Sequence, residues 1–113
     1  MSLETHYCKL LALRSYKSPS RTPDECLPET LESGSIYTFL KSGQRIFDLN
    51  NPIPLHETQG DEMLSKPIAL VNIIKATHHK TGDTIWTSGK YVISEVIPEN
   101  KKLVWSNGRF TIE

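Results

Sequence analysis

The apolar run at residues 67–77, PIALVNIIKAT, constrains the fold more than any other stretch of the chain. Successive side chains of an extended strand point to opposite faces, and this run is apolar at both odd and even positions. Such a strand is covered on both faces, either at the centre of a layered sheet or in the wall of a barrel. We therefore expect five residues of this run to be buried in one strand: Ile68, Leu70, Val71, Ile73 and Ile74.

Most of the remaining chain also has the character of β-strands. Residues 5–15, 35–41, 45–49 and 83–97 are rich in apolar, aromatic or β-branched side chains. Gly89 interrupts the last of these segments and indicates a bulge or a bend. The Asn107-Gly108 pair lies between two further β-rich runs and predicts a hairpin at 102–113, because a type I′ turn requires two positive φ angles.

Prolines mark the segments that we expect to lie outside the sheet. Pro52 and Pro54 predict an extended path outside a sheet, and the polar stretch HETQGDEMLSK that follows is expected to be a loop. Residues 16–33 contain three more prolines among polar residues, which predicts an irregular, relatively mobile connection with one helical turn near residues 23–26. Limited proteolysis is expected to cut this connection first.

These patterns predict an all-β (mainly β) chain with little helix. The expected architecture is a small closed or partly open antiparallel β-barrel, or a sandwich, of about six to seven short strands. A length of 113 residues suits one domain, which would span residues 1–113 and include the 16–33 connection and the 102–113 hairpin. A domain of this size needs no disulfide, so Cys8 and Cys26 are expected to be reduced, although a bridge between them remains an alternative.

The charge balance and the short apolar stretches weigh against two classes of partner, nucleic acids and membranes. Thirteen basic residues match thirteen acidic ones, whereas nucleic-acid binding usually relies on an excess of basic residues. No apolar stretch approaches the roughly 20 residues of a membrane span, and the N-terminus lacks the features of a signal peptide. We therefore expect a cytoplasmic protein without a membrane partner.

The adjacent residues His78 and His79 raise the question of a metal site. Neighbouring side chains diverge in a strand, and zinc needs three or four protein ligands. The other ligand candidates show no metal-binding spacing: they are His6, Cys8, His56 and Glu57. We expect HHKTGD to be a hairpin tip, with Gly82 at positive φ, that binds no metal.

No motif for catalysis or for a cofactor is present. The chain has no nucleophile elbow and no glycine-rich nucleotide loop. The segment KSGQR at residues 41–45 has the composition to hold one anion, although a plain turn is the simpler interpretation. We therefore predict no catalytic residue, no metal and no cofactor.

The leading hypothesis is a non-enzymatic small binding or interaction domain for a protein or a small ligand. One alternative is a PUA- or OB-like RNA-binding barrel, because aromatic residues lie near basic ones and exposed aromatic side chains stack bases. A second alternative is a small enzyme that uses histidine and carboxylates. The candidate contact residues for a ligand or RNA are Arg45, Lys90, Lys102, Arg109, His78 and His79.

The segment SIYTFLKSGQRIFDLNNPIPL resembles a family of short β-rich bacterial proteins of unknown function, found in cyanobacteria and Bacillus-type organisms. Its members carry the stretch G-Y-R-I-x-P-I-x-x-P-I. Six positions match without a gap, namely Gly43, Arg45, Ile46, Leu49, Pro52 and Ile53. Gln44 replaces the aromatic residue and Asp48 replaces the first proline.

The resemblance extends beyond this motif. The opening HYCKLLAL is similar to that family's P-C-E-V-N-S-I-L-K-L, and residues 69–96 fit its last two strands, so most of residues 5–97 is covered. The resemblance implies a small β-barrel-like domain and transfers no catalytic residue. The tail after Pro98 extends beyond the pattern.

Overall fold

The computed structural model describes residues 5–60 and 63–113, and almost all regular structure in it is β. The only helical element in these residues is a short 3₁₀ helix, η1 (Pro23–Glu25). The strands are β1 (Thr5–Cys8), β2 (Leu11–Arg14), β3 (Ile36–Ser42), β4 (Gln44–Phe47), β5 (Ile53–Gly60), β6 (Met63–Leu64), β7 (Ala69–Thr81), β8 (Thr84–Val96), β9 (Leu103–Ser106) and β10 (Arg109–Ile112). The prediction of a mainly β chain is confirmed. No helix in the described residues is long and apolar enough to cross a membrane.

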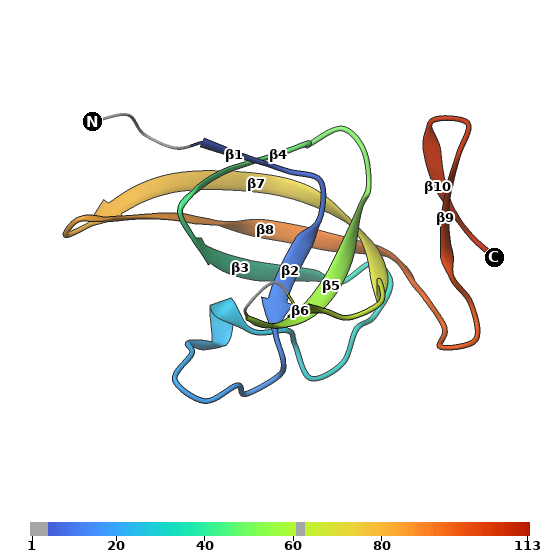
Figure 1. Ribbon diagram of the computed structural model, residues 1–113, viewed down its shortest axis with the longest axis horizontal. Helices are drawn as coiled ribbons and strands as arrows, with labels where there is room; N and C mark the ends of the chain where they lie inside the picture. Colours follow the sequence, from blue (N-terminus) through green and yellow to red (C-terminus); the bar gives the residue numbers. More distant parts are fainter. Residues whose placement is uncertain (1–4, 61–62) are drawn as a thin grey trace.

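Six strands form the main sheet, in the order β2-β5-β7-β8-β3 with β6 added to β5 (Figure 1). The path has two ends, β2 and β3, and no ladder joins them among the described residues, so the sheet is not closed. The details differ from the expected set of about six to seven short antiparallel strands. The described residues contain ten strands, β7 and β8 have 13 residues each, and the pairs β1–β4 and β2–β5 are parallel.

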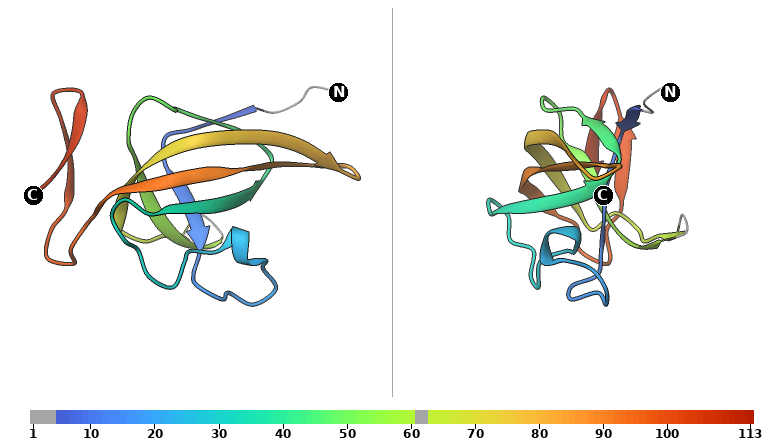
Figure 2. Two further views of the ribbon diagram at one scale, coloured as in Figure 1. Left: turned by 180° about the vertical axis from the view of Figure 1, so that it is seen from behind. Right: turned by 90° about the vertical axis from the view of Figure 1, so that its left-hand side faces the viewer.

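The core lies on the inner face of this sheet. Leu11 and Leu13 of β2 and Phe39 of β3 belong to one buried cluster, although they come from opposite ends of the strand order. The sheet must therefore curl around the core, and the views from behind and from the side show this curvature (Figure 2). Phe39 also packs edge-to-face against Phe47 of β4, with the ring centroids 5.3 Å apart.

The expected burial of the long apolar run holds for only some of its residues. Leu70, Val71 and Ile73 are buried in β7, whereas Ile68 precedes the strand and is half-buried. The expectation for Ile74 is wrong, because 48% of this residue is exposed. Ile74 follows the buried Ile73 and points to the opposite face of the strand, which is not covered at this point, and the register of β7 against β8 shifts between Ile73 and Lys75.

Gly89 of β8 marks a close approach of two backbones. A Cβ atom added at this position would lie 2.0 Å from the backbone oxygen of Lys75 and 2.8 Å from a ring carbon of Phe39. The bulge expected at Gly89 therefore belongs to the facing strand β7, and glycine is required on β8 because no side chain fits there.

The expectation that this part of the chain lies outside a sheet is wrong for residues 53–60 and 63–64, which form β5 and β6, and Asp61 and Glu62 of the expected loop lie outside the described residues. Pro54 is buried in β5, where it pairs with Leu70 of β7, and the polar residues after it continue the same strand. A proline in a strand lacks only its N–H group. The ladder between β5 and β2 begins one residue later, at Leu55 opposite Leu11, so Pro54 lies just before that ladder.

The proline-rich connection contains η1 at the position where a helical turn is predicted. Its centre is tied to the sheet: the Leu27 N–H donates to the Arg14 oxygen at 2.7 Å, and the Thr38 hydroxyl donates to the Asp24 carboxylate at 2.6 Å. Cys26 and Leu27 are buried. The expected irregular path is present on both sides of η1, but the centre of the segment packs against β2 and β3.

Two smaller pairs of strands complete the fold. The segment expected as one strand at residues 5–15 is divided at residues 9–10, because β1 pairs with β4 whereas β2 pairs with β5. At the other end of the molecule, β9 and β10 form a separate hairpin beside the main sheet (Figure 1). Asn107 and Gly108 at its turn have φ angles of 53° and 77°.

Candidate anion-binding site

The six contact residues proposed from the sequence lie in different parts of the fold. Arg45 is on β4, His78 and His79 are on β7, and Lys90 is on β8. Lys102 and Arg109 belong to the C-terminal hairpin. The structure brings two of the six into contact, since His78 Nε2 lies 2.8 Å from the backbone oxygen of Arg45.

The histidine pair is not at the hairpin tip itself. The turn is formed by Gly82, at a φ of 60°, and Asp83, whereas His78 and His79 lie within β7 opposite Thr87 and Trp86 of β8. The description of HHKTGD as a tip is therefore correct for its last two residues only. Within residues 5–60 and 63–113, no group of three or more His, Cys, Asp or Glu side chains is placed to hold a metal ion.

A cationic pocket of about 230 Å³ lies where the two end strands of the main sheet approach each other. Arg14 of β2, Lys41 of β3 and Arg45 of β4 line it, together with Arg21 from the connection before η1. Among the described residues, Glu25 supplies the only carboxylate of the lining. Four cationic side chains thus face one acidic side chain around a small space.

Lys41 spans the gap between the end strands. Its Nζ donates a hydrogen bond of 2.5 Å to the backbone oxygen of Ala12 on β2. Burial of the amine is the largest cause that lowers the pKa of Lys41 from 10.5 to about 8, and the charge of Arg45 acts in the same direction. Arg14 and Arg21 lower this pKa further, whereas Cys8 raises it. The amine therefore titrates close to neutral pH.

Backbone acceptors hold two of the pocket's guanidinium groups. Arg14 Nη1 donates to the Gln59 oxygen at 2.6 Å, and Arg45 Nε donates to the Ser42 oxygen at 2.8 Å. A guanidinium group has five N–H donors, so each arginine retains donors beyond these bonds. In the described part of the chain, the ion pair of this pocket joins Arg21 Nη1 to Glu25 Oε2 at 3.1 Å.

Glu25 is held in its charged form by neighbouring donors. Burial raises the pKa of this carboxyl, but hydrogen bonds from the Thr22 N–H and from Arg21 outweigh burial, and the pKa is lowered overall. The same carboxylate accepts from the Thr22 hydroxyl at 3.1 Å. Glu25 thus fixes Arg21 beside the pocket and neutralises only that one of the four cations.

The turn between β3 and β4 places Lys41 and Arg45 at the same pocket. Gly43 has a φ of 91°, a conformation that side chains disfavour, and its N–H donates to the Ile85 oxygen at 2.7 Å. The fully buried Thr87 hydroxyl donates to the Gly43 oxygen at 2.7 Å and accepts from the Arg45 N–H at 3.0 Å. These hydrogen bonds fix the backbone of Arg45 and therefore the point from which its side chain extends.

The KSGQR segment was the one sequence signal for this site, because it contains both Lys41 and Arg45. Arg14 and Arg21 were missed by sequence reasoning. They are separated from KSGQR by at least 20 positions and belong to no recognisable motif. Only the curl of the sheet and the return of the connection over β2 bring them to the pocket.

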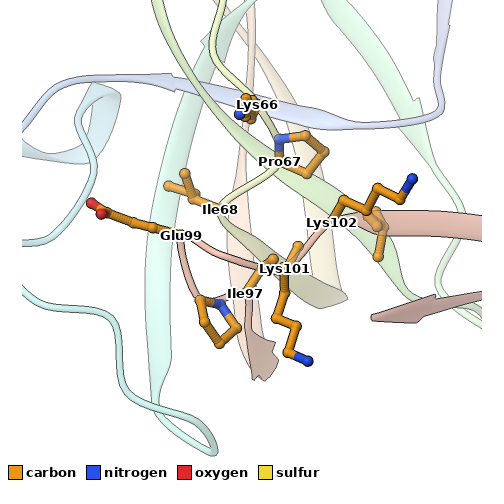
Figure 3. A pocket seen from close by; sticks show the side chains of 9 residues that line it. Lys66, Pro67, Ile68, Ile97, Glu99, Lys101 and Lys102 are labelled. Carbon is orange, nitrogen blue, oxygen red and sulfur yellow. The ribbon is translucent and has the colours of Figure 1, made fainter. Parts of the chain in front are cut away.

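A larger groove of about 680 Å³ lies between the main sheet and the C-terminal hairpin (Figure 3). Its apolar lining includes Ile68, Ile97 and Leu103, and the Ile97 N–H donates to the Ile68 oxygen at 3.0 Å. The charged ends of Glu99 and Lys102 point to different sides in Figure 3 and do not converge. Because polar groups converge in the cationic pocket and not in this groove, the pocket is the candidate site for a charged ligand.

Fold and site together define a mainly β domain with a cationic pocket at the open side of its main sheet. No protein-family model, curated protein or solved structure matches the chain. The resemblance to the β-rich bacterial family therefore stays a prediction.

Proposed function

We propose that the protein is a non-enzymatic binding domain, built as a partly open β-barrel, that holds a small molecule by its phosphate or carboxylate group. The observation that carries this proposal is the cationic pocket, in which Arg14, Arg21, Lys41 and Arg45 surround a space of about 230 Å³ with one carboxylate among them. That space suits the anionic end of a small metabolite better than a large ring system.

The electrostatics of the pocket favour an anion. Like charges brought together in a half-buried space repel one another, and the lowered pKa of Lys41 is one consequence of burial and of this repulsion. A bound anion would relieve the repulsion and accept charge-assisted hydrogen bonds, each worth roughly 1.5–3 kcal/mol. The paired N–H donors of a guanidinium group match the geometry of phosphate and carboxylate oxygens, so Arg14 and Arg45 would orient the bound group.

Calorimetric titration with inorganic sulfate and phosphate tests the proposal. We expect saturable binding to the unmodified protein and an affinity lower by about tenfold in Arg45→Gln, which corresponds to about 1.4 kcal/mol. Lys80→Gln is the matched control, because Lys80 is an exposed residue of β7 that does not line the pocket. Equal affinity in all three proteins, or no saturable binding, would overturn the proposal.

Binding of RNA is a second candidate, supported by a specific observation on the C-terminal hairpin. Trp105 is 62% exposed and packs edge-to-face against Phe110, with centroids 4.7 Å apart, on a hairpin that also carries Arg109. An exposed aromatic side chain beside a cation can stack a nucleic-acid base. Phe39, Phe47 and Tyr91, by contrast, are buried, so these rings are not accessible to a base.

Fluorescence of the hairpin tryptophan tests this second candidate. In a Trp86→Phe background, Trp105 is the remaining tryptophan, and stacking of a single-stranded RNA oligomer should quench its emission in a saturable manner. Arg109→Ala should weaken the effect. Absence of quenching at low salt would exclude this role for the hairpin.

A further inference from the structure

Lys41 differs chemically from the three arginines that share its pocket. A guanidinium group remains protonated under all physiological conditions and is not a nucleophile, whereas a lysine amine becomes nucleophilic once it loses its proton. The Lys41 Nζ is fixed by its hydrogen bond to Ala12 and also lines the pocket. An anion bound by Arg14 and Arg45 would therefore lie beside a positioned amine.

We propose that Lys41 forms an imine with an aldehyde or ketone whose phosphate or carboxylate group is held by the arginines of the cationic pocket. This inference rests on the proposed anion-binding function and specifies its ligand class. The bound molecule would be held by two features at once, an anionic group and a carbonyl carbon.

The covalent step balances without an oxidant or a reductant. The lone pair of the neutral Lys41 Nζ attacks the carbonyl carbon, and the carbonyl π electrons move to oxygen. Proton transfer from nitrogen to oxygen gives a carbinolamine, which loses one water molecule to leave a C=N bond. The products are the imine and water, and hydrolysis reverses the step.

The surroundings of Lys41 favour the neutral amine that this step requires. Burial and neighbouring cations lower the pKa of Lys41 to about 8, and placement beside other cations is a recognised way to activate a lysine. The charged groups that act on Lys41 come from several elements, namely Cys8 of β1, Arg14 of β2, Arg21 of the connection and Arg45 of β4, and Glu25 also lines the pocket.

Reductive trapping with a phosphorylated aldehyde tests the inference. The protein is incubated at about pH 8 with pyridoxal 5′-phosphate as the probe, then reduced with borohydride, digested and analysed by mass spectrometry. We expect the label on Lys41 to form at least tenfold faster than on exposed lysines such as Lys80. Excess sulfate should suppress it, and pyridoxal, which lacks the phosphate, should label Lys41 more slowly.

Three variants separate the covalent step from anion binding. Lys41→Arg keeps the positive charge but has no nucleophilic amine, so it should lose the dominant label, whereas Lys80→Gln, outside the pocket, should keep both the label and sulfate binding. Cys8→Ser should keep the label, because the attacking group is the amine and not the thiol. If sulfate binds to the unmodified protein but the label is spread evenly over the exposed lysines, the imine is excluded and the anion-binding function stands. If neither sulfate binding nor selective labelling occurs, both proposals fall.

Discussion

A hydrogen bond of 2.5 Å from the Lys41 amine to the Ala12 backbone oxygen joins β3 to β2, the two end strands of the main sheet. No strand ladder connects β2 to β3 in the described residues, so this side-chain bond bridges the open side of the sheet. The same amine lines the cationic pocket. The site and the gap in the sheet therefore occupy one place in the fold.

The affinity for sulfate should fall as the pH rises through about 8. Sulfate stays fully ionised in this range, and an anion binds better when Lys41 carries its proton. Because the pKa of Lys41 in the free protein is about 8, the positive charge is present below that pH and is lost above it. Isothermal titration between about pH 7 and 9.5 measures the effect.

The controls for this pH dependence follow from the groups that face Lys41. Lys41→Arg should flatten the profile, because arginine remains charged throughout the range. Cys8→Ser should preserve the profile if the amine is responsible. A profile that disappears in Cys8→Ser would assign the effect to the thiol and contradict the prediction.

Two neighbouring isoleucines of β7 should differ sharply in their contribution to stability. Ile73 is 1% exposed and Ile74 is 48% exposed, because adjacent side chains of a strand point to opposite faces and the face of Ile74 is not covered. We expect Ile73→Ala to lower the free energy of unfolding by about 2–5 kcal/mol and Ile74→Ala by less than about 1 kcal/mol. Urea denaturation of both variants provides the comparison, and similar losses would show that both faces of β7 are covered at this point.

The hydroxyl group of Thr87 should contribute more to stability than the shape of the side chain. Thr87→Val keeps the volume but leaves the Arg45 N–H and the Gly43 oxygen without their buried partner, which we expect to cost about 1–3 kcal/mol of unfolding free energy. The same change should weaken sulfate binding, because β4 carries Arg45. Thr87→Ser keeps the hydroxyl and should retain the affinity, and a Val variant that binds as tightly as the Ser variant would contradict this reasoning.

Replacement of Gly89 by alanine should destabilise the fold. The added methyl group would collide with the Lys75 oxygen at 2.0 Å, and backbone atoms cannot move aside as a flexible side chain can. We expect a loss of at least about 1–3 kcal/mol in thermal or urea unfolding. Ser88→Ala in the adjacent position serves as control, and equal stability of the two variants would show that the strands do not approach so closely.

The buried hydroxyl of Tyr91 should be dispensable. It has no hydrogen-bond partner among the described residues, and burial raises the pKa of this phenol. Because an unsatisfied buried hydroxyl costs free energy, we expect Tyr91→Phe to leave the free energy of unfolding unchanged or to raise it by up to about 1 kcal/mol. A clear loss in urea denaturation would indicate a partner for the hydroxyl.

Local chemistry made several features of this protein predictable from its sequence. Dense β-branched and aromatic residues indicated the mainly β class, and the Asn107-Gly108 pair indicated a hairpin turn, because a two-residue turn with positive φ angles depends on those residues alone. The burial of Val71 and Ile73 follows from an apolar run with no polar face. Each of these features depends on residues that are close together in the chain.

The features that escaped prediction depend on which strands become neighbours. Pro54 is tolerated in β5 because the ladder to β2 begins at the next residue, and Ile74 is exposed because its face of β7 is not covered at that position. Strand pairing of this kind is a property of two segments that are distant in sequence, so neither proline nor hydrophobicity alone decides the outcome.

The candidate site was the part least accessible to sequence reasoning. The sequence by itself determined the charges of KSGQR and the glycine at its turn, and these gave a weak indication of an anion-binding site. The tertiary structure decided that Arg14 and Arg21 join Lys41 and Arg45, because the curled sheet brings β2 to β3 and the connection returns over both. Burial and mutual repulsion of these charges then set the pKa of Lys41, and both arise only when the folded chain removes water from between groups that are far apart in sequence.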